Sequence, residues 1–246
     1  GEEYAGDISW HPNLERDREV LRKYNDFMSS HSWARKSVTH RSFNDNEFSA
    51  GRVHTAYQNI FNRRVPVRKL TLLDGESIAE PDFTANHLTL LSMIFDEYLP
   101  DDPYRKVAEE TAMSRDAVKQ AFVLLMGVRD KKGWAEAQWE LLKSEYEITH
   151  KQSNHIRESF YKCIPFLKKH DLLGTGWGGK LQYLEGETAI LMFEWAVETQ
   201  TPIVNVHDAF ACKKQDEQTV KQKMHEMRDK VLSSVGGYML GRKENK

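Results

Sequence analysis

The sequence predicts an α+β fold in which helices back an antiparallel sheet and a helical segment interrupts it. Two β-prone runs lie far apart in the chain, at about 67–82 and 202–211, and each contains a hairpin signal. Helical periodicity fills most of the stretch between them, without the regular strand–helix alternation of a parallel sheet. We therefore expect the sheet to be assembled from distant segments around a helical insertion.

Composition limits the classes of protein that fit. The chain has 246 residues, 39% of them hydrophobic, which is enough for one large domain or two small ones. Its formal net charge is −2, so nucleic-acid binding would need a local basic patch. Two cysteines, Cys163 and Cys212, exclude a disulfide framework and favour a reducing, cytoplasmic environment. No apolar run has membrane-spanning length and no signal peptide opens the sequence, so we expect no membrane association.

The N-terminal part has one clear regular element. An amphipathic helix is expected at 15–31, because Leu21, Tyr24 and Met28 share one face. Residues 32–52 are mostly polar and rich in turn formers, so they are expected to be irregular.

A β-hairpin is predicted next. Residues 67–73 form its first strand, Asp74-Gly75 its turn, and Glu76 to Asp82 its second strand. Pro81 should end the pairing and leave Asp82 at the exit of the strand.

Helices are expected through the middle of the chain and near its end. Pro103 at a first helical position, Ser114 as an N-cap and Gly127 as a stop mark two of them. A glycine-rich run, Gly174–Gly179, is expected to be a flexible joint, because it lacks the context of a phosphate-binding loop. The expected helices are 85–98, 103 onward, 115–127, 133–148, 153–169, 181–198 and 215–233.

The second hairpin, Pro202 to Ala211, has the turn His207-Asp208 between two apolar strands. Asp82 and Asp208 would thus both stand at strand ends. Carboxylates are the ligands that Mg²⁺ prefers, and a pair of such ions supports phosphoryl and nucleotidyl transfer. In the alternative interpretation, Asp82 caps the following helix and Asp208 only serves a turn.

Arg115 and Lys119 lie one turn apart on an expected helix and therefore share a face, which Phe122 continues. The two cations could hold the phosphates of a nucleotide while Phe122 lies under its base. In the alternative, the helix is solvated and Phe122 belongs to the core. The spacing alone favours the alternative.

A basic stretch with no acidic residue runs from 52 to 69. It is a candidate path for a nucleic-acid backbone, and the alternative is that these side chains simply face solvent. Its cations are Arg52, Arg63, Arg64, Arg68 and Lys69. The spacing of His150, His155, Cys163 and His170 matches no common closed zinc site, so no zinc is expected.

Taken together, these motifs resemble family A DNA polymerases and their relatives, the single-subunit RNA polymerases. The matching segments follow the family's order and cover about half of the chain. They are Ser49-Ala50-Gly51-Arg52 with Tyr57-Gln58-Asn59-Ile60, Glu80-Pro81-Asp82 through His87 (motif A), Arg115 to Lys119 ending near Gly127 (motif B), Leu184-Glu185-Gly186-Glu187-Thr188-Ala189, and Val206-His207-Asp208 (motif C).

The resemblance implies a role for each matched residue. Asp82 and Asp208 would bind the catalytic Mg²⁺ or Mn²⁺ ions, and Lys119 would act in catalysis while holding the triphosphate together with Arg115. His87 would also line the nucleotide site, and Phe122 is a candidate there from its helical spacing alone. His87 stands where DNA-polymerising members have the glutamate that excludes ribose. The resemblance implies that Arg52, Gln58 and His207 contact the nucleic acid, His207 near the primer terminus. Arg63 and Arg64 join them as candidates from the basic stretch.

The resemblance also implies an architecture. An antiparallel palm sheet would be built from 51–100 and 181–246, with helical fingers at 101–180 and a thumb remnant at 1–50. Two departures from the pattern are Met126-Gly127 in place of Tyr-Gly and Ala209 in place of a second acid. A reduced palm and fingers with an altered sugar gate resembles the small primase-polymerases of phages and mobile elements.

We therefore expect a template-directed nucleotidyltransferase in DNA replication that makes or extends short primers on single-stranded DNA from nucleoside triphosphates. The low net charge suggests an accessory DNA-binding protein or helicase as partner. One alternative is a minimal single-subunit RNA polymerase, or one that copies RNA. Another is a catalytically inactive palm that binds nucleic acid as a replisome subunit.

Overall fold

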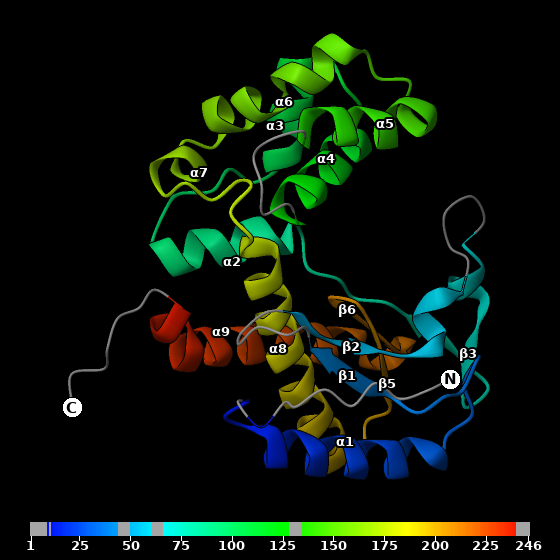
Figure 1. Ribbon diagram of the computed structural model, residues 1–246. Coiled ribbons are helices and arrows are strands. Elements are labelled where there is room, and N and C mark those ends of the chain that lie inside the picture. Colours follow the sequence, from blue (N-terminus) through cyan, green and yellow to red (C-terminus); the bar gives the residue numbers. More distant parts are fainter. Residues whose placement is uncertain (1–8, 10, 44–49, 61–65, 128–133, 240–246) are drawn as a thin grey trace. The chain divides into compact units, whose positions relative to one another are not determined.

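The computed structural model describes residues 9, 11–43, 50–60, 66–127 and 134–239 (Figure 1). The chain divides into two compact units. Residues Gly1–Phe83 and Gln182–Lys246 form one, here called the discontinuous unit, and Thr84–Leu181 form the other, the helical unit. The sequence-based boundaries placed residues up to 100 in the first palm segment, whereas the contacts group 84–100 with the helices.

A four-stranded antiparallel sheet is central to the discontinuous unit. Its strand order is β3-β4-β6-β5, so a hairpin from the first half of the chain pairs with one from the second half. This confirms that distant segments form one antiparallel sheet in an α+β fold. The strands are β3 (Leu72–Leu73), β4 (Glu76–Ala79), β5 (Ile203–Val206) and β6 (Ala209–Lys213).

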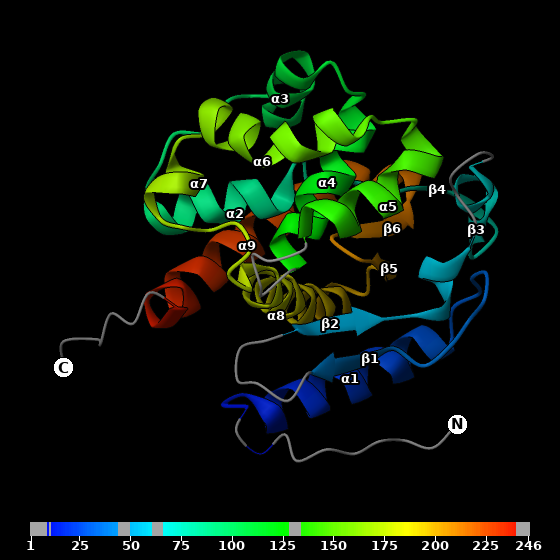
Figure 2. The ribbon, with the colours of Figure 1, turned by 45° about the horizontal axis from the view of Figure 1, so that its top comes forward.

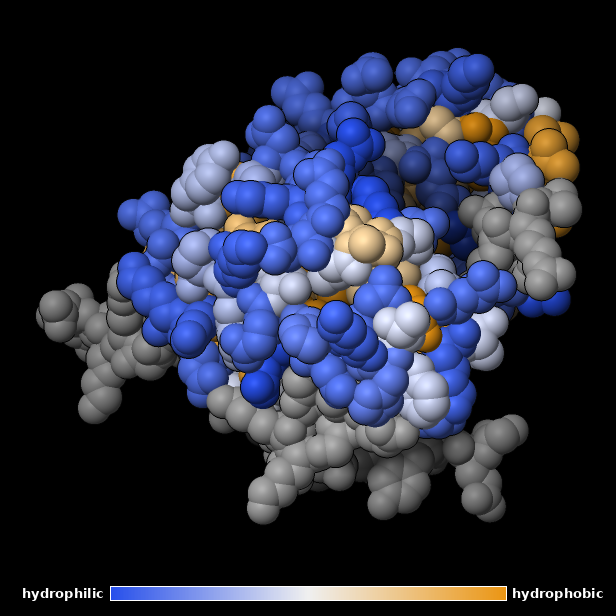
Figure 3. All heavy atoms as spheres, turned by 90° about the horizontal axis from the view of Figure 1, so that it is seen from above, coloured by the Kyte–Doolittle hydropathy of each residue, from blue (hydrophilic) through white to orange (hydrophobic). Residues whose placement is uncertain are grey.

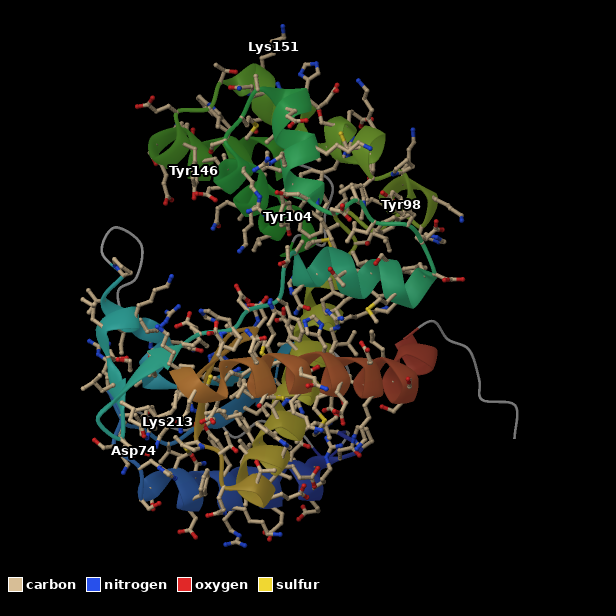
Figure 4. All side chains as sticks on the ribbon, turned by 180° about the vertical axis from the view of Figure 1, so that it is seen from behind. Asp74, Tyr98, Tyr104, Tyr146, Lys151 and Lys213 are labelled. Carbon is tan, nitrogen blue, oxygen red and sulfur yellow. The ribbon has the colours of Figure 1, made fainter. Side chains whose placement is uncertain are left out.

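The predicted turn of the β3–β4 hairpin is confirmed, but its first strand is shorter than expected. Asp74 and Gly75 both have positive φ, at 54° and 80°, as a two-residue hairpin turn requires. Lys213 at the end of β6 reaches the Asp74 carboxylate at 3.3 Å (Figure 4). Val67–Leu70 forms a short 3-10 helix, η2, in place of strand, because it follows Pro66 and its backbone bonds close locally.

A second, two-stranded sheet lies in the stretch expected to be irregular. Strands β1 (His40–Phe43) and β2 (Ala50–His54) pair in antiparallel fashion, with a register shift at Ser42/Phe43. The expectation for 32–52 was therefore wrong in this part. Tertiary pairing forms these strands, and their polar composition hides them from a search for apolar alternation.

The hydrophobic core of this unit lies between the strands and three helices, α1 (Leu14–Ser29), α8 (Trp177–Thr199) and α9 (Glu217–Met239) (Figures 1 and 2). Tyr24 on α1 stacks on Phe193 of α8, with ring centroids 3.9 Å apart. Its hydroxyl donates to the carbonyl of Ile203 at 2.6 Å, which satisfies the polar end of a fully buried side chain. Short 3-10 helices η1 (Ala56–Asn59) and η3 (Lys214–Asp216) connect these elements.

The helical unit confirms the start signals read from the sequence. The Asp102 carboxylate accepts a bond from the Arg105 amide ahead of Pro103, and the Ser114 hydroxyl accepts one from the Ala117 amide. Its helices are α2 (Asn86–Phe95), α3 (Pro103–Thr111), α4 (Arg115–Gly127), α5 (Trp134–Tyr146), α6 (His150–Cys163) and α7 (Phe166–Lys169).

The run Gly174–Gly179 is not a simple joint. Helix α8 begins at Trp177, so Gly178 and Gly179 are helical. A Cβ at Gly178 would lie 2.6 Å from the Met126 carbonyl oxygen, and the Gly174 amide donates to the Leu125 carbonyl. Close packing against the end of α4 therefore accounts for glycine in this run.

Among the described residues, no helix combines the length and the apolar character that crossing a bilayer requires. The face shown in Figure 3 is mostly hydrophilic, with hydrophobic side chains at scattered points. Both cysteines are free and buried, as expected for a chain without a disulfide framework.

Candidate active site

Strands β4 and β6 bring Asp82 and Asp208 to the same end of the four-stranded sheet. Ala79 pairs with Cys212, and the Phe210 amide donates to the Pro81 carbonyl at 3.2 Å. If the same register continues by one residue beyond Pro81, Asp82 faces Ala209, the first residue of β6. Asp208 directly precedes Ala209 in the chain. Asp82 is exposed and Asp208 is half-buried.

The turn that carries Asp208 is a tight one. Val206 pairs with Ala209, so only His207 and Asp208 connect the strands. His207 has φ +58°, a left-handed conformation that costs a non-glycine residue about 1–2 kcal/mol. The fully buried Asn205 supports the turn, because its side-chain amide donates to the His207 carbonyl at 2.9 Å. Strain of this kind is concentrated at functional sites.

Charged side chains lie within electrostatic reach of the turn. Burial lowers the pKa of His207, and Arg52, Arg68 and His54 lower it further. Glu185 on α8 acts in the opposite direction. Because Arg52 affects the pKa of His207, these two residues predicted to contact nucleic acid lie close enough to interact electrostatically.

Arg52 is held by a partner that the sequence analysis did not assign to the site. Its Nε and Nη2 both donate to Oε2 of Glu185, at 3.0 and 2.9 Å. Gln58 is in contact with the same strand, because its side-chain amide lies 3.1 Å from Nδ1 of His54. Arg63 and Arg64 lie outside the described residues.

A two-bond ion pair flanks Asp82. Arg68 donates through Nε and Nη2 to the two carboxylate oxygens of Glu80, at 2.6 and 2.5 Å. The hydrogen bond to Glu80 raises the pKa of Arg68, and Asp82 adds to that effect. A half-buried cation is therefore fixed near the exit of β4.

The residues predicted to bind the nucleotide lie in the helical unit. Arg115 is paired with Asp102, with Nε at 3.0 Å from Oδ2, and its guanidinium lies over the ring of Tyr104. Lys119, one turn further along α4, is exposed. His87 is half-buried in the first turn of α2.

Phe122 does not have the surface that its predicted role requires. It is fully buried and packs against Tyr104 and Phe160, with ring centroids 5.8 and 5.4 Å away. Tyr104 lies among the helices of this unit (Figure 4). The prediction that Phe122 lies under a nucleotide base is therefore wrong, because its side chain has no exposed surface.

A buried cluster of charges lies elsewhere in the discontinuous unit. His11, Asp17 and Glu187 offer ligand atoms within 4.8 Å of one another and could hold a metal ion. It is the one such group of three found among the described residues, and it does not include Asp82 or Asp208. Sequence reasoning missed it, although two acids flanking Gly186 within an apolar helix were a usable signal.

Two arginines already neutralise this cluster. Nη1 of Arg41 donates to Asp17 and Glu187 at 2.5 and 2.6 Å, and Arg16 contacts the same two acids at 2.8 Å. Burial raises the pKa of Asp17, but His11 and the two arginines outweigh it and hold that pKa below its ordinary value. With a guanidinium between the carboxylates, we interpret the cluster as a structural ion network.

Two glycines bring helix α8 against strand β2 beside this network. A Cβ at Gly186 would lie 1.9 Å from the Gly51 carbonyl oxygen, a distance that no side chain could occupy. Gly51 has φ +79°, and its carbonyl accepts a bond from Nε of Arg41 at 2.6 Å. The contact sets Arg52 directly beside Glu185.

No protein-family model matches the chain, and no curated protein matches it significantly.

Proposed function

We propose that this protein is a template-directed nucleotidyltransferase that makes or extends short primers on single-stranded DNA. In this proposal Asp82 and Asp208 bind the catalytic Mg²⁺ or Mn²⁺ ions. The observation that carries it is the antiparallel register of β4 and β6, which puts the two acids at one end of a shared sheet.

The geometry of a sheet supports a shared ion site. Neighbouring strands lie about 4.7–4.9 Å apart, and Asp208 directly precedes Ala209, the residue opposite Asp82. Paired catalytic ions lie about 3.5–4 Å apart, so two carboxylates that converge at this end of the sheet could coordinate both ions. Bound there, the ions would activate the attacking hydroxyl and stabilise the leaving pyrophosphate.

The chain's own residues would do the rest. Arg52 and Arg68 near the turn could donate to the phosphates of a polyanion at the same end of the sheet. Lys119 and Arg115 would bind the triphosphate, and Arg115 would exchange its exposed pair with Asp102 for a phosphate. His207, rigidly held by the turn, would lie near the primer terminus.

The palm and fingers assignment belongs to the same proposal. By the resemblance, Asp82 after β4 would correspond to motif A and Asp208 in the hairpin turn to motif C. A minimal RNA polymerase uses the same parts, and product analysis on defined templates with ribo- and deoxyribonucleotides distinguishes the two. An inactive, DNA-binding palm would show no incorporation at all.

The test is nucleotide incorporation on single-stranded DNA with Mg²⁺ or Mn²⁺, with and without a primer. Asp82→Asn and Asp208→Asn should each reduce incorporation below detection, because each removes a ligand charge while keeping the shape of the side chain. Asp229→Asn, an exposed acid on α9, is the matched control and should retain activity. Incorporation by both site variants at the native rate would refute the metal assignment.

A further inference from the structure

Two histidines lie directly across the two-stranded sheet from each other. His40 begins β1 and His54 ends β2, and the two residues are partners in the antiparallel register. Their ring centroids are 5.5 Å apart and their planes are inclined by 25°. His40 is exposed and His54 is half-buried, so the pair is open to solvent. Opposite positions on antiparallel strands have Cβ atoms about 4.5–5.5 Å apart, which lets two imidazoles reach one ion.

We propose that His40 and His54 form a surface site for a divalent ion that prefers nitrogen ligands, with Zn²⁺ as the first candidate. Imidazole suits Zn²⁺, Ni²⁺ and Cu²⁺, whereas Mg²⁺ and Mn²⁺ favour oxygen ligands. The class of ion therefore differs from the one proposed for Asp82 and Asp208. The inference goes beyond the proposed function, because it requires neither of these acids and no nucleic acid.

The separation of the two rings agrees with that of two imidazoles on one ion. Zn–N bonds are about 2.0–2.1 Å long, so two rings on a tetrahedral ion have their centres about 5 Å apart. The observed 5.5 Å is close to that value, and small side-chain rotations would bring the two nitrogens to the ion. Water would fill the remaining coordination positions, as in zinc sites that keep an open position.

Gln58 supplies an outer contact of the kind that orients a ligating histidine. Its side-chain amide lies 3.1 Å from Nδ1 of His54. With the amide oxygen at that place, Gln58 accepts a hydrogen bond from Nδ1–H and leaves the lone pair of the ring on Nε2, where an ion can bind. Gln58 is itself held in η1, because its backbone amide donates to the hydroxyl of the N-cap residue Thr55.

The electrostatic surroundings act in two directions. Burial lowers the pKa of His54, and His40 and Arg52 lower it further, which favours the neutral imidazole that binds metals. The same positive charge of Arg52 opposes a bound cation. Since only two protein ligands are present as well, we expect weaker binding than at a closed zinc site with four protein ligands.

Isothermal titration calorimetry with Zn²⁺ alone measures the affinity and the stoichiometry. The native protein should show a saturable site that His40→Ala and His54→Ala each weaken about 100-fold, because one imidazole cannot chelate. The double variant should bind no more weakly than either single one. His155→Ala removes an exposed imidazole from α6 and should leave the affinity unchanged. Any Zn²⁺ bound at the buried cluster around His11 would persist in all these variants, so the difference isolates the surface site.

Two substitutions of Gln58 test the outer contact. Gln58→Ala should weaken Zn²⁺ binding about 10–100-fold, the usual effect of removing such a partner. Gln58→Glu keeps an acceptor at Nδ1 and should retain the affinity. A residue that only shapes the loop would not discriminate between the two substitutions in this way. Mg²⁺ in excess should not compete with Zn²⁺ at this site.

Circular dichroism checks that each variant is folded. His40 is exposed, so His40→Ala decides alone if His54→Ala does not fold. Equal Zn²⁺ affinity in the native and His40→Ala proteins, or no saturable binding by the native protein, would overturn the inference. Either result would leave the polymerase proposal intact, because that proposal is tested by nucleotide incorporation in the Asp82 and Asp208 variants.

Discussion

Replacing Arg41 with methionine tests whether the buried ion network stabilises the discontinuous unit. The Arg41 side chain is 2% exposed and donates to two acids and to two backbone carbonyls, those of Gly51 and Tyr183. Methionine fills similar space without a charge. The substitution therefore leaves Asp17 and Glu187 buried with one guanidinium fewer.

The expected loss follows from those contacts. Removing one partner of a buried ion pair costs about 3–5 kcal/mol, because the remaining charge stays in a poorly solvating site. A buried carbonyl left without its donor costs about 1–3 kcal/mol, and the two effects are not fully additive. We expect a loss of about 5 kcal/mol, which is large against the roughly 5–15 kcal/mol that stabilise a typical domain.

Urea unfolding followed by circular dichroism measures this loss, and the melting temperature should fall by about 10–20 °C. Arg22→Met is the control, because Arg22 forms an exposed pair with Glu19 on the same helix and its loss should leave the midpoint unchanged. Adding Glu187→Gln to the Arg41 variant should recover part of the stability. An Arg41→Met protein as stable as the Arg22→Met control would refute the structural role of the network.

Two further predictions concern the β3–β4 turn and the helical unit. Burial raises the pKa of Asp74, but bonds from the Ser32 amide, His31 and Lys213 outweigh it and lower that pKa to about 2. The stabilising effect of the Asp74 carboxylate is therefore complete above about pH 4 and is lost as the pH falls toward 2. In Asp74→Asn the free energy of unfolding should depend less on pH over that range. An unchanged dependence on pH would contradict this prediction. Phe122→Ala should cost about 3–5 kcal/mol in urea unfolding, because it empties a core site. Unaltered stability with weakened nucleotide binding would instead support the stacking role.

Local signals in the sequence predicted local structure well. The Asp-Gly turn, the helix start at Pro103, the cap at Ser114, and the two-residue His207-Asp208 turn each depend on a few adjacent residues, and all are present in the structure. The meeting of β4 and β6 needed only the further assumption that two apolar hairpins share one sheet.

The failures have a common physical origin in tertiary contacts. Strands β1 and β2 are polar, so their pairing leaves no alternation in the sequence. In the sequence, Glu185 and Glu187 look like ordinary acidic residues of a helix. In the fold, Glu185 pairs with Arg52 and Glu187 pairs with Arg41. The helical spacing of Phe122 favoured the core, and it is buried there; the nucleotide role came from placing it on the face of Arg115 and Lys119.

The close backbone contact between Gly51 and Gly186 has a consequence for finding distant relatives of this protein by sequence. A single methyl group at Gly186 would drive the helix off the strand, so substitutions accumulating around the two glycines should spare them. Surface acids and loops are free to drift, and overall identity would decay long before this contact changes. A search for distant relatives should therefore look for Gly51-Arg52 together with Glu185-Gly186-Glu187 far downstream. This pair of motifs should be given more weight than similarity averaged over the whole chain.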